Sequence, residues 1–170
     1  MRKQWRNPTM KLYHGSDTLV PEPNLQKCKP FKDFGKGFYL SADYSQAQKM
    51  AEQKSSLSNG VNPPIVSNFY FDESALTDNF LKVKCFNSYT EEWAEFVLRN
   101  RDRKNKQPYH NYDIVYGPIA DDRIVRQMRR FELGDITLAE LMRELKYPKG
   151  ITFQYYFGSE KALSKLMFLC

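Results

Sequence analysis

Asp33-Phe34-Gly35-Lys36-Gly37-Phe38-Tyr39-Leu40-Ser41 is the segment around which we build the expected fold. Its two glycines allow the backbone to adopt positive φ, or allow another group to approach closely. Residues 37–41 are typical of a short strand, in which Phe38 and Tyr39 point to opposite faces. Taken alone, the segment is equally consistent with a pocket wall and with a tight hairpin that carries a core aromatic residue.

The composition suits one globular domain. The chain has 170 residues, of which 41% are hydrophobic, enough for a packed core. We expect a basic N-terminal arm at residues 1–9 and a single domain at 10–170. No apolar run is long enough to span a membrane, and the N-terminus has no signal-peptide pattern. Three widely spaced cysteines favour a reducing compartment, so we expect a cytoplasmic protein.

Basic residues are concentrated in one part of the sequence. Between Arg99 and Arg130 there are nine basic and four acidic residues, in a chain whose net charge is +6. Such a stretch can attract nucleic acid or an anionic cofactor. Solvated helix faces are the commoner explanation, so the charge alone gives only weak support for either partner.

Strands interspersed with helices predict an α+β fold with a mixed or antiparallel sheet. A helix begins at Ser45 and places Ala47, Met50 and Ala51 on one face. Capping boxes are expected at Ser88 with Glu91 and at Thr137 with Glu140. Further helices begin at Asp121 or Asp122 and at Ser159, and a turn is expected at residues 148–150. The expected strands span residues 10–14, 37–41, 65–71, 80–86, 113–116, 151–157 and 167–169.

Several common enzyme motifs are absent from the sequence. The spacing around Gly35 and Gly37 fits neither a phosphate-binding P-loop nor a dinucleotide-binding fingerprint. The two histidines, His14 and His110, lack a zinc-ligand pattern, and we expect no metal. His14-Gly15-Ser16 follows a strand and could bind a hydroxyl-rich or amide-bearing ligand, although an exposed corner is the simpler interpretation.

Two of these segments together are more specific than either alone. His14-Gly15-Ser16, followed about twenty residues later by Gly35-Lys36-Gly37-Phe38-Tyr39 and a Ser/Ala-bearing helix, resembles the ADP-ribosyltransferase superfamily, most of all its poly-ADP-ribose-polymerase branch. The chain resembles more closely a poorly characterised bacterial family with this fold, on motifs at residues 33–39, 93–101, 113–122 and 154–163. Members of that family are often the toxin of a toxin–antitoxin pair, which implies an antitoxin protein as a partner.

The resemblance implies a split sheet with flanking helices and an NAD site. NAD would be a substrate, with His14 on the adenosine ribose and the Gly15 backbone, beside Ser16, on the nicotinamide amide. Tyr39 would stack on the nicotinamide ring. The implied catalytic residues are His14, Tyr39 and Gln154, and the implied NAD-binding residues are His14, Gly15, Ser16, Gly37, Phe38, Tyr39 and Ala47.

The sequence departs from the polymerase pattern at one important position. The late strand carries Gln154 where the polymerases have glutamate, so the residue acting on the ribose could instead be Glu160, Asp121 or Asp122. The second nicotinamide-stacking aromatic residue would fall near Met50. These departures favour transfer of one ADP-ribose to a macromolecular acceptor, either protein or RNA/DNA. The alternatives are NAD hydrolysis and an inactive module that binds NAD or nucleic acid.

Overall fold

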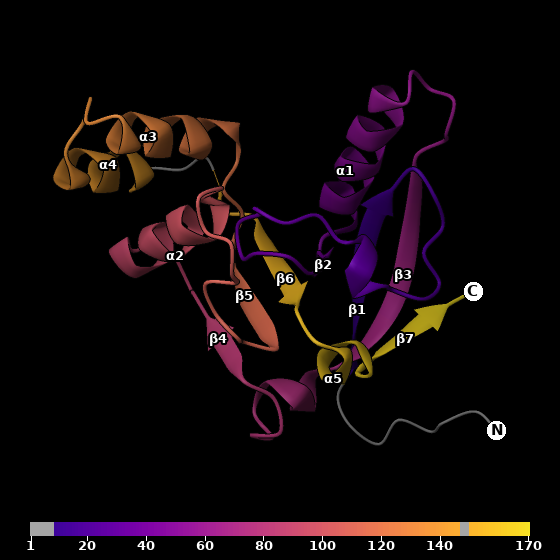
Figure 1. Cartoon of the computed structure of the whole chain (residues 1–170). Helices are drawn as coiled ribbons and strands as arrows, with labels where there is room; N and C mark the ends of the chain where they lie inside the picture. The colour runs from indigo at the N-terminus through magenta and orange to yellow at the C-terminus, as the bar shows by residue number, and fades with distance from the viewer. Residues whose placement is uncertain (1–8, 147–149) are drawn as a thin grey trace.

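The structure, a computed structural model, describes residues 9–146 and 150–170 and has an α+β fold (Figure 1). The arm expected at residues 1–9 lies outside the described residues except for Thr9, which begins the first strand. Of the turn expected at 148–150, only Gly150 is described, with a φ of +79°.

Two sheets form the centre of the fold. β1 (Thr9–Ser16), β3 (Ile65–Asp72) and β7 (Leu166–Leu169) form an antiparallel sheet in the order β1-β3-β7. β2 (Phe38–Leu40), β6 (Phe153–Phe157), β5 (Ile114–Pro118) and β4 (Val83–Cys85) form the second, in the order β2-β6-β5-β4. This second sheet is mixed, because β4 and β5 are parallel and the other pairs are antiparallel.

The two sheets meet at β1 and β2. The N–H groups of Tyr13 and Ser41 each donate to the other residue's carbonyl oxygen, at 2.8 and 2.9 Å. The connection is a single bridge rather than a continuous ladder. The split sheet expected from the sequence is therefore present, and its dividing line runs beside the His14 segment.

Within the described residues, five α-helices surround the sheets. α1 (Tyr44–Leu57) packs on β1 and β3, and α3 (Asp122–Glu132) packs against α4 (Leu138–Leu145) at the other side of the molecule (Figure 1). α2 (Glu91–Arg101) covers the second sheet, and α5 (Glu160–Leu163) precedes β7. Asp121, Thr137 and Ser159 each accept a hydrogen bond from a backbone N–H in the first turn. The caps predicted at these positions, including the capping box at Thr137, are confirmed.

Several predicted boundaries of helices and strands were wrong. α1 begins at Tyr44 rather than Ser45, because Asp43 is its cap. Thr90 caps α2, through a bond from the Trp93 N–H, in place of the predicted box at Ser88. The strand predicted over residues 80–86 is only Val83–Cys85, and β1 continues through Gly15 and Ser16.

Hydrophobic side chains fill both faces of the second sheet. Along β5, Val115 belongs to a cluster under α2, α3 and α4 that includes the fully buried Trp93. Its neighbour Ile114 belongs to a cluster shared with β1 and β3 that includes Phe38 and Phe69. Met50, expected on the buried face of α1, is 40% exposed. In the described parts of the chain, no helix has both the length and the apolar character needed to cross a membrane.

Candidate functional site

The three sequence segments expected to build the site lie on neighbouring strands. His14, Gly15 and Ser16 are the last residues of β1, beside β2. Tyr39 lies at the centre of β2 and is paired with Tyr156 on β6. Gln154 is two residues earlier on β6, so its side chain leaves the sheet on the same face as Tyr156 and Tyr39.

His14 is anchored through one ring nitrogen. Its Nδ1 lies 2.7 Å from the carbonyl oxygen of Tyr39, and its ring stacks on Phe38 at 4.3 Å. Burial, followed by the nearby Lys54 ammonium, lowers the pKa of His14 from 6.5 to about 4. The imidazole is therefore neutral at pH 7, and because a carbonyl only accepts, Nδ1 carries the proton. Nε2 is left as a hydrogen-bond acceptor.

Tyr39 has a buried hydroxyl and a partly exposed ring. The hydroxyl donates to the Gly35 carbonyl at 2.8 Å and accepts from the Phe34 N–H at 3.0 Å. Burial is the main cause that raises the pKa of Tyr39 well above its ordinary value. These bonds hold the turn before β2, in which Gly35 has a φ of +91° that a residue with a side chain would rarely adopt.

Gly15 allows α1 to approach β1. A Cβ atom at Gly15 would lie 1.9 Å from the Ala47 carbonyl oxygen. The residue thus brings Ala47, also expected at the site, into contact with the strand. The Gly15 carbonyl accepts from Lys54 Nζ at 2.8 Å. Ser16 is buried, and its hydroxyl lies 3.4 Å from Asp17 Oδ1.

Gly37 makes room for a neighbouring side chain of the protein itself. A Cβ atom there would lie 2.2 Å from Cε2 of Tyr156, whose hydroxyl donates to the Lys36 carbonyl at 3.1 Å. Phe38 is buried and faces the cluster shared with β1 and β3, as expected for the core side of the strand.

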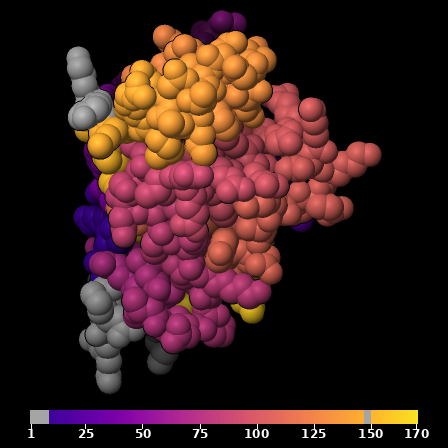
Figure 2. Space-filling view, turned by 90° about the vertical axis from the view of Figure 1, so that its left-hand side faces the viewer, coloured from indigo at the N-terminus to yellow at the C-terminus, as the bar shows by residue number. Residues whose placement is uncertain are grey.

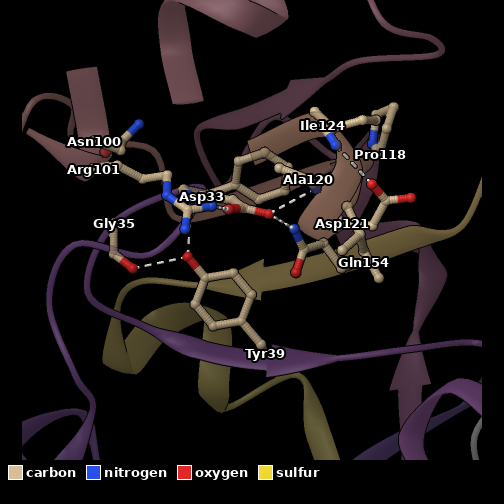
Figure 3. Close-up of polar contacts among 12 residues, drawn as sticks. Asp33, Gly35, Tyr39, Asn100, Arg101, Pro118, Ala120, Asp121, Ile124 and Gln154 are labelled. Carbon is tan, nitrogen blue, oxygen red and sulfur yellow. Dashed lines mark hydrogen bonds and ion pairs between the residues drawn. The ribbon is translucent and has the colours of Figure 1, made fainter. Parts of the chain in front are cut away.

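Gln154 belongs to a buried polar network centred on Asp33 (Figure 3). Asp33 Oδ2 accepts from Gln154 Nε2 at 2.9 Å and from the Ala120 N–H at 3.0 Å. Asp33 Oδ1 forms an ion pair with Arg101 NH1 at 2.8 Å. Burial raises the pKa of the Asp33 carboxyl, while Arg101 and the two other donors act in the opposite direction. The network fixes the Gln154 amide nitrogen, so that its oxygen remains available as an acceptor.

The other carboxylates proposed for the ribose make no bond to Gln154 or Asp33 in the described residues, although Asp121 directly follows Ala120, whose N–H donates to Asp33. Asp121 caps α3 through a bond from the Ile124 N–H at 2.9 Å, and Asp122 is exposed in the first turn of that helix. Glu160 lines a surface hollow of about 310 Å³ beside Pro21, Pro23 and Phe168. None of these three belongs to the Asp33 network in the residues that the structure describes.

The structure does not bring all the expected residues to one place. The His14 ring lies against Phe38, whose side chain leaves β2 on the face opposite Tyr39. Gln154 is on the Tyr39 face. Over residues 9–146 and 150–170, no hydrogen bond or ring contact joins His14 to Gln154. The candidate site therefore consists of two parts, joined by the β2 backbone that His14 contacts.

Three residues of the site had no role in the sequence-based prediction. Asp33 and Arg101 stand in segments quoted for the resemblance, but nothing in their local pattern indicates that they pair. Lys54 lies seven residues after Ala47 and three after Ala51, on the face of α1 toward β1, which is the signal that could have found it. Among the described residues, no group of three or more His, Cys, Asp or Glu side chains could hold a metal ion.

Comparison with known proteins identifies the family. The family described as "Protein of unknown function (DUF3990)" matches residues 10–168. This chain belongs to the DUF3990 family. The DUF3990 match includes β2 and β6 in full, β1 except for Thr9, and every residue of the candidate site. None of the curated proteins or solved structures compared with the chain matches it.

Proposed function

We propose that this protein is an NAD-dependent mono-ADP-ribosyltransferase that acts on a macromolecular acceptor in the cytoplasm. The observation that carries the proposal is the adjacency of β1, β2 and β6, with the His14 ring bonded to the Tyr39 backbone and Gln154 on the Tyr39 face. The three segments of the resemblance, which are far apart in sequence, are thus neighbours in space.

The reaction needs few groups from the protein. The bond between the ribose C1′ and the nicotinamide nitrogen breaks, its electron pair leaves with nicotinamide, and an acceptor nucleophile bonds to C1′ and loses its proton. The transition state is oxocarbenium-like, as in glycoside cleavage. The partly exposed Tyr39 ring offers a flat surface for the nicotinamide, and His14 Nε2 offers an acceptor for a ribose hydroxyl.

Gln154 is the candidate for holding the reacting ribose. Because its amide nitrogen is bonded to Asp33, its oxygen can accept from a ribose hydroxyl without rotating. A fixed acceptor of this kind costs no reorganisation during the reaction. Asp33 is then a positioning residue, and its charge is largely compensated by Arg101. A neutral amide at position 154, in place of the glutamate of the polymerases, favours single transfer over chain elongation.

Incubation with biotinylated NAD and cell lysate tests the proposal. We expect label on a macromolecule with wild-type protein and at least about tenfold less with His14→Gln or Gln154→Ala, the loss expected when one such hydrogen bond is removed. His110→Gln is the matched control, because His110 is also a histidine bonded to a backbone carbonyl, that of Phe34 at 2.7 Å. Thermal unfolding of each variant separates loss of activity from loss of fold.

The same experiment separates the alternatives. Free ADP-ribose without labelled macromolecules would support an NAD hydrolase and contradict transfer. NAD binding without release of nicotinamide would support an inactive binding module. For a role as the toxin of a toxin–antitoxin pair, we expect induced expression to stop growth in wild type and not in Gln154→Ala. Equal growth of the two strains would contradict that role.

A further inference from the structure

Two short segments hold more positive charge than the whole chain. Residues 27–36 carry Lys27, Lys29, Lys32 and Lys36 with one acidic residue, Asp33. Residues 99–106 carry Arg99, Arg101, Arg103, Lys104 and Lys106 with one acidic residue, Asp102. Together they have a net charge of +7, against +6 for the full chain, so the remainder is close to neutral.

The fold brings these two segments together, although 68 positions separate Asp33 from Arg101. These two side chains form the ion pair at 2.8 Å. The Arg103 guanidinium lies over the Phe31 ring, 5.9 Å from its centroid. The segments therefore form one surface, which we name the basic rim, defined by residues 27–36 and 99–106. The arginines of α3, grouped with residues 99–106 in the sequence, lie on a different helix.

Most cations of the basic rim are exposed and lack a carboxylate partner. Arg99 pairs with Glu95, and Arg101 with the buried Asp33. Within the described ranges, the other seven form no ion pair, and all seven are exposed. A surface with this much uncompensated charge attracts a polyanion rather than one small anion.

Aromatic side chains lie among these charges. Tyr109 is 43% exposed, and the Arg99 guanidinium lies over its ring, 5.6 Å from the centroid. Tyr109 and Arg99 line an open hollow of about 490 Å³ together with Lys104 and Lys106. The chain after α2 projects from the body of the molecule at this place (Figure 2). Stacking platforms within a positively charged groove are the pattern by which proteins bind unpaired nucleic acid strands.

We propose that the basic rim binds a single-stranded nucleic acid, which serves as the acceptor. The role as acceptor rests on the proposed function, whereas the binding does not. Phosphates would contact the lysines and arginines, and bases would stack on Tyr109. Arg101 belongs to the basic rim and, through Asp33, to the Gln154 network. A strand bound along the rim would therefore pass beside the candidate site.

Fluorescence anisotropy with a labelled 12-nucleotide single strand, without NAD, tests the binding. Lys104→Glu/Lys106→Glu should weaken it at least about tenfold at low salt and lower the slope of log K against log salt by about 1.4, the value for two lost phosphate contacts. Arg126→Glu/Arg129→Glu on α3 removes equal charge from exposed positions and should change affinity less than about twofold. Tyr109→Ala should weaken binding without changing the salt slope.

Three results would overturn the inference. The first is an equal loss of affinity in Lys104→Glu/Lys106→Glu and in Arg126→Glu/Arg129→Glu. Such a result would mean that the strand is attracted by the net charge of the protein and not by the basic rim. The second is competition by polyglutamate as effective as by an unlabelled strand, which would indicate an acidic protein. The third is binding of a duplex as tight as of the single strand. The Lys104→Glu/Lys106→Glu variant could also fail to bind nucleic acid and still label proteins as well as wild type does. In that case nucleic acid is not the ADP-ribose acceptor, and the proposal of a transferase stands.

Discussion

At the scale of single residues, the chemistry of Gln154 is set by its partner. Its amide nitrogen donates to Asp33, and Asp33 also accepts from the Ala120 N–H and pairs with Arg101. A glutamate at position 154 would place a second carboxylate against Asp33. The glutamine is therefore matched to its surroundings and cannot be treated as an interchangeable replacement for the glutamate of the polymerases.

We expect Gln154→Glu to destabilise the fold by about 3 kcal/mol at pH 7.5, because it removes an amide donor from the buried Asp33 carboxylate and places a second carboxylate against it. The two carboxyls would share a proton, so the folded state would bind more protons than the unfolded state. Stability should therefore recover as the pH falls toward 5. Urea unfolding at several pH values measures this. Gln154→Ala is the control, because it removes the amide without adding a charge. If Gln154→Glu were as stable as wild type at pH 7.5, the contact between Gln154 and Asp33 would be contradicted.

His14 should make stability depend on pH. Its pKa is lowered from 6.5 to about 4 in the fold, so between these values the unfolded state binds more protons. Stability is then lost as the pH falls through this window, by about 2 kcal/mol after allowing for the partial exposure of the ring. Urea midpoints between pH 7 and 4.5 measure the effect. His14→Gln should flatten the curve; an unchanged pH dependence in this variant would place the titrating group elsewhere.

At the scale of elements, the contact between α1 and β1 depends on one missing side chain. A Cβ atom at Gly15 would collide with the helix backbone at Ala47, which cannot move without shifting α1. This close packing also places Lys54 on the Gly15 carbonyl and near His14. The glycine of the His-Gly-Ser segment is thus required by helix packing, whatever ligand its backbone binds.

Gly15→Ala should lower the free energy of unfolding by about 3 kcal/mol, at the upper end of overpacking effects. Gly60→Ala is the comparison, because Gly60 has a φ of +72° and open space around it. That substitution should cost only about 1 kcal/mol of backbone strain. Chemical denaturation ranks the two variants. The packing argument would be wrong if Gly60→Ala were the more damaging change.

At the scale of the whole molecule, the second sheet separates two hydrophobic clusters that share its strands. Ile114 and Val115 are neighbours on β5, yet each belongs to a different cluster. Neither cluster can lose its packing while the sheet between them remains intact. We therefore expect the described parts of the chain to unfold as one cooperative unit.

Trp93, buried in the cluster under α2, reports on this cooperativity. In a Trp5→Phe background, Ile114→Ala should leave a cavity in the opposite cluster and destabilise by about 2–5 kcal/mol. In this variant, the unfolding midpoint measured by Trp93 fluorescence should shift as much as the midpoint measured by circular dichroism. Val115→Ala is the comparison, because Val115 lies in the same cluster as Trp93, and there too the two midpoints should shift together. Separate transitions for the two probes in the Ile114→Ala variant would show that the clusters unfold independently.

Local patterns were sufficient to predict most elements of this fold. The alternation over 65–71 buries Ser67, Phe69 and Phe71 as expected, and the capping box at Thr137 forms. These features depend on residues within one or two turns of each other. The strand at 80–86 was predicted too long because the Lys82 N–H donates to Asp113, 31 positions away, outside the β4 ladder.

The residue pairs that form the candidate site and the basic rim could be found only from the tertiary structure. Gln154 and Arg101 reach Asp33 across 121 and 68 positions, and the basic segment expected to continue onto α3 instead meets residues 27–36. No local pattern encodes such pairs, because their energies depend on which side chains a complete fold buries together. Hydrophobic periodicity and helix caps predict whether a segment forms a helix or a strand. The residue that pairs with a buried charge is determined only when distant strands and helices pack together.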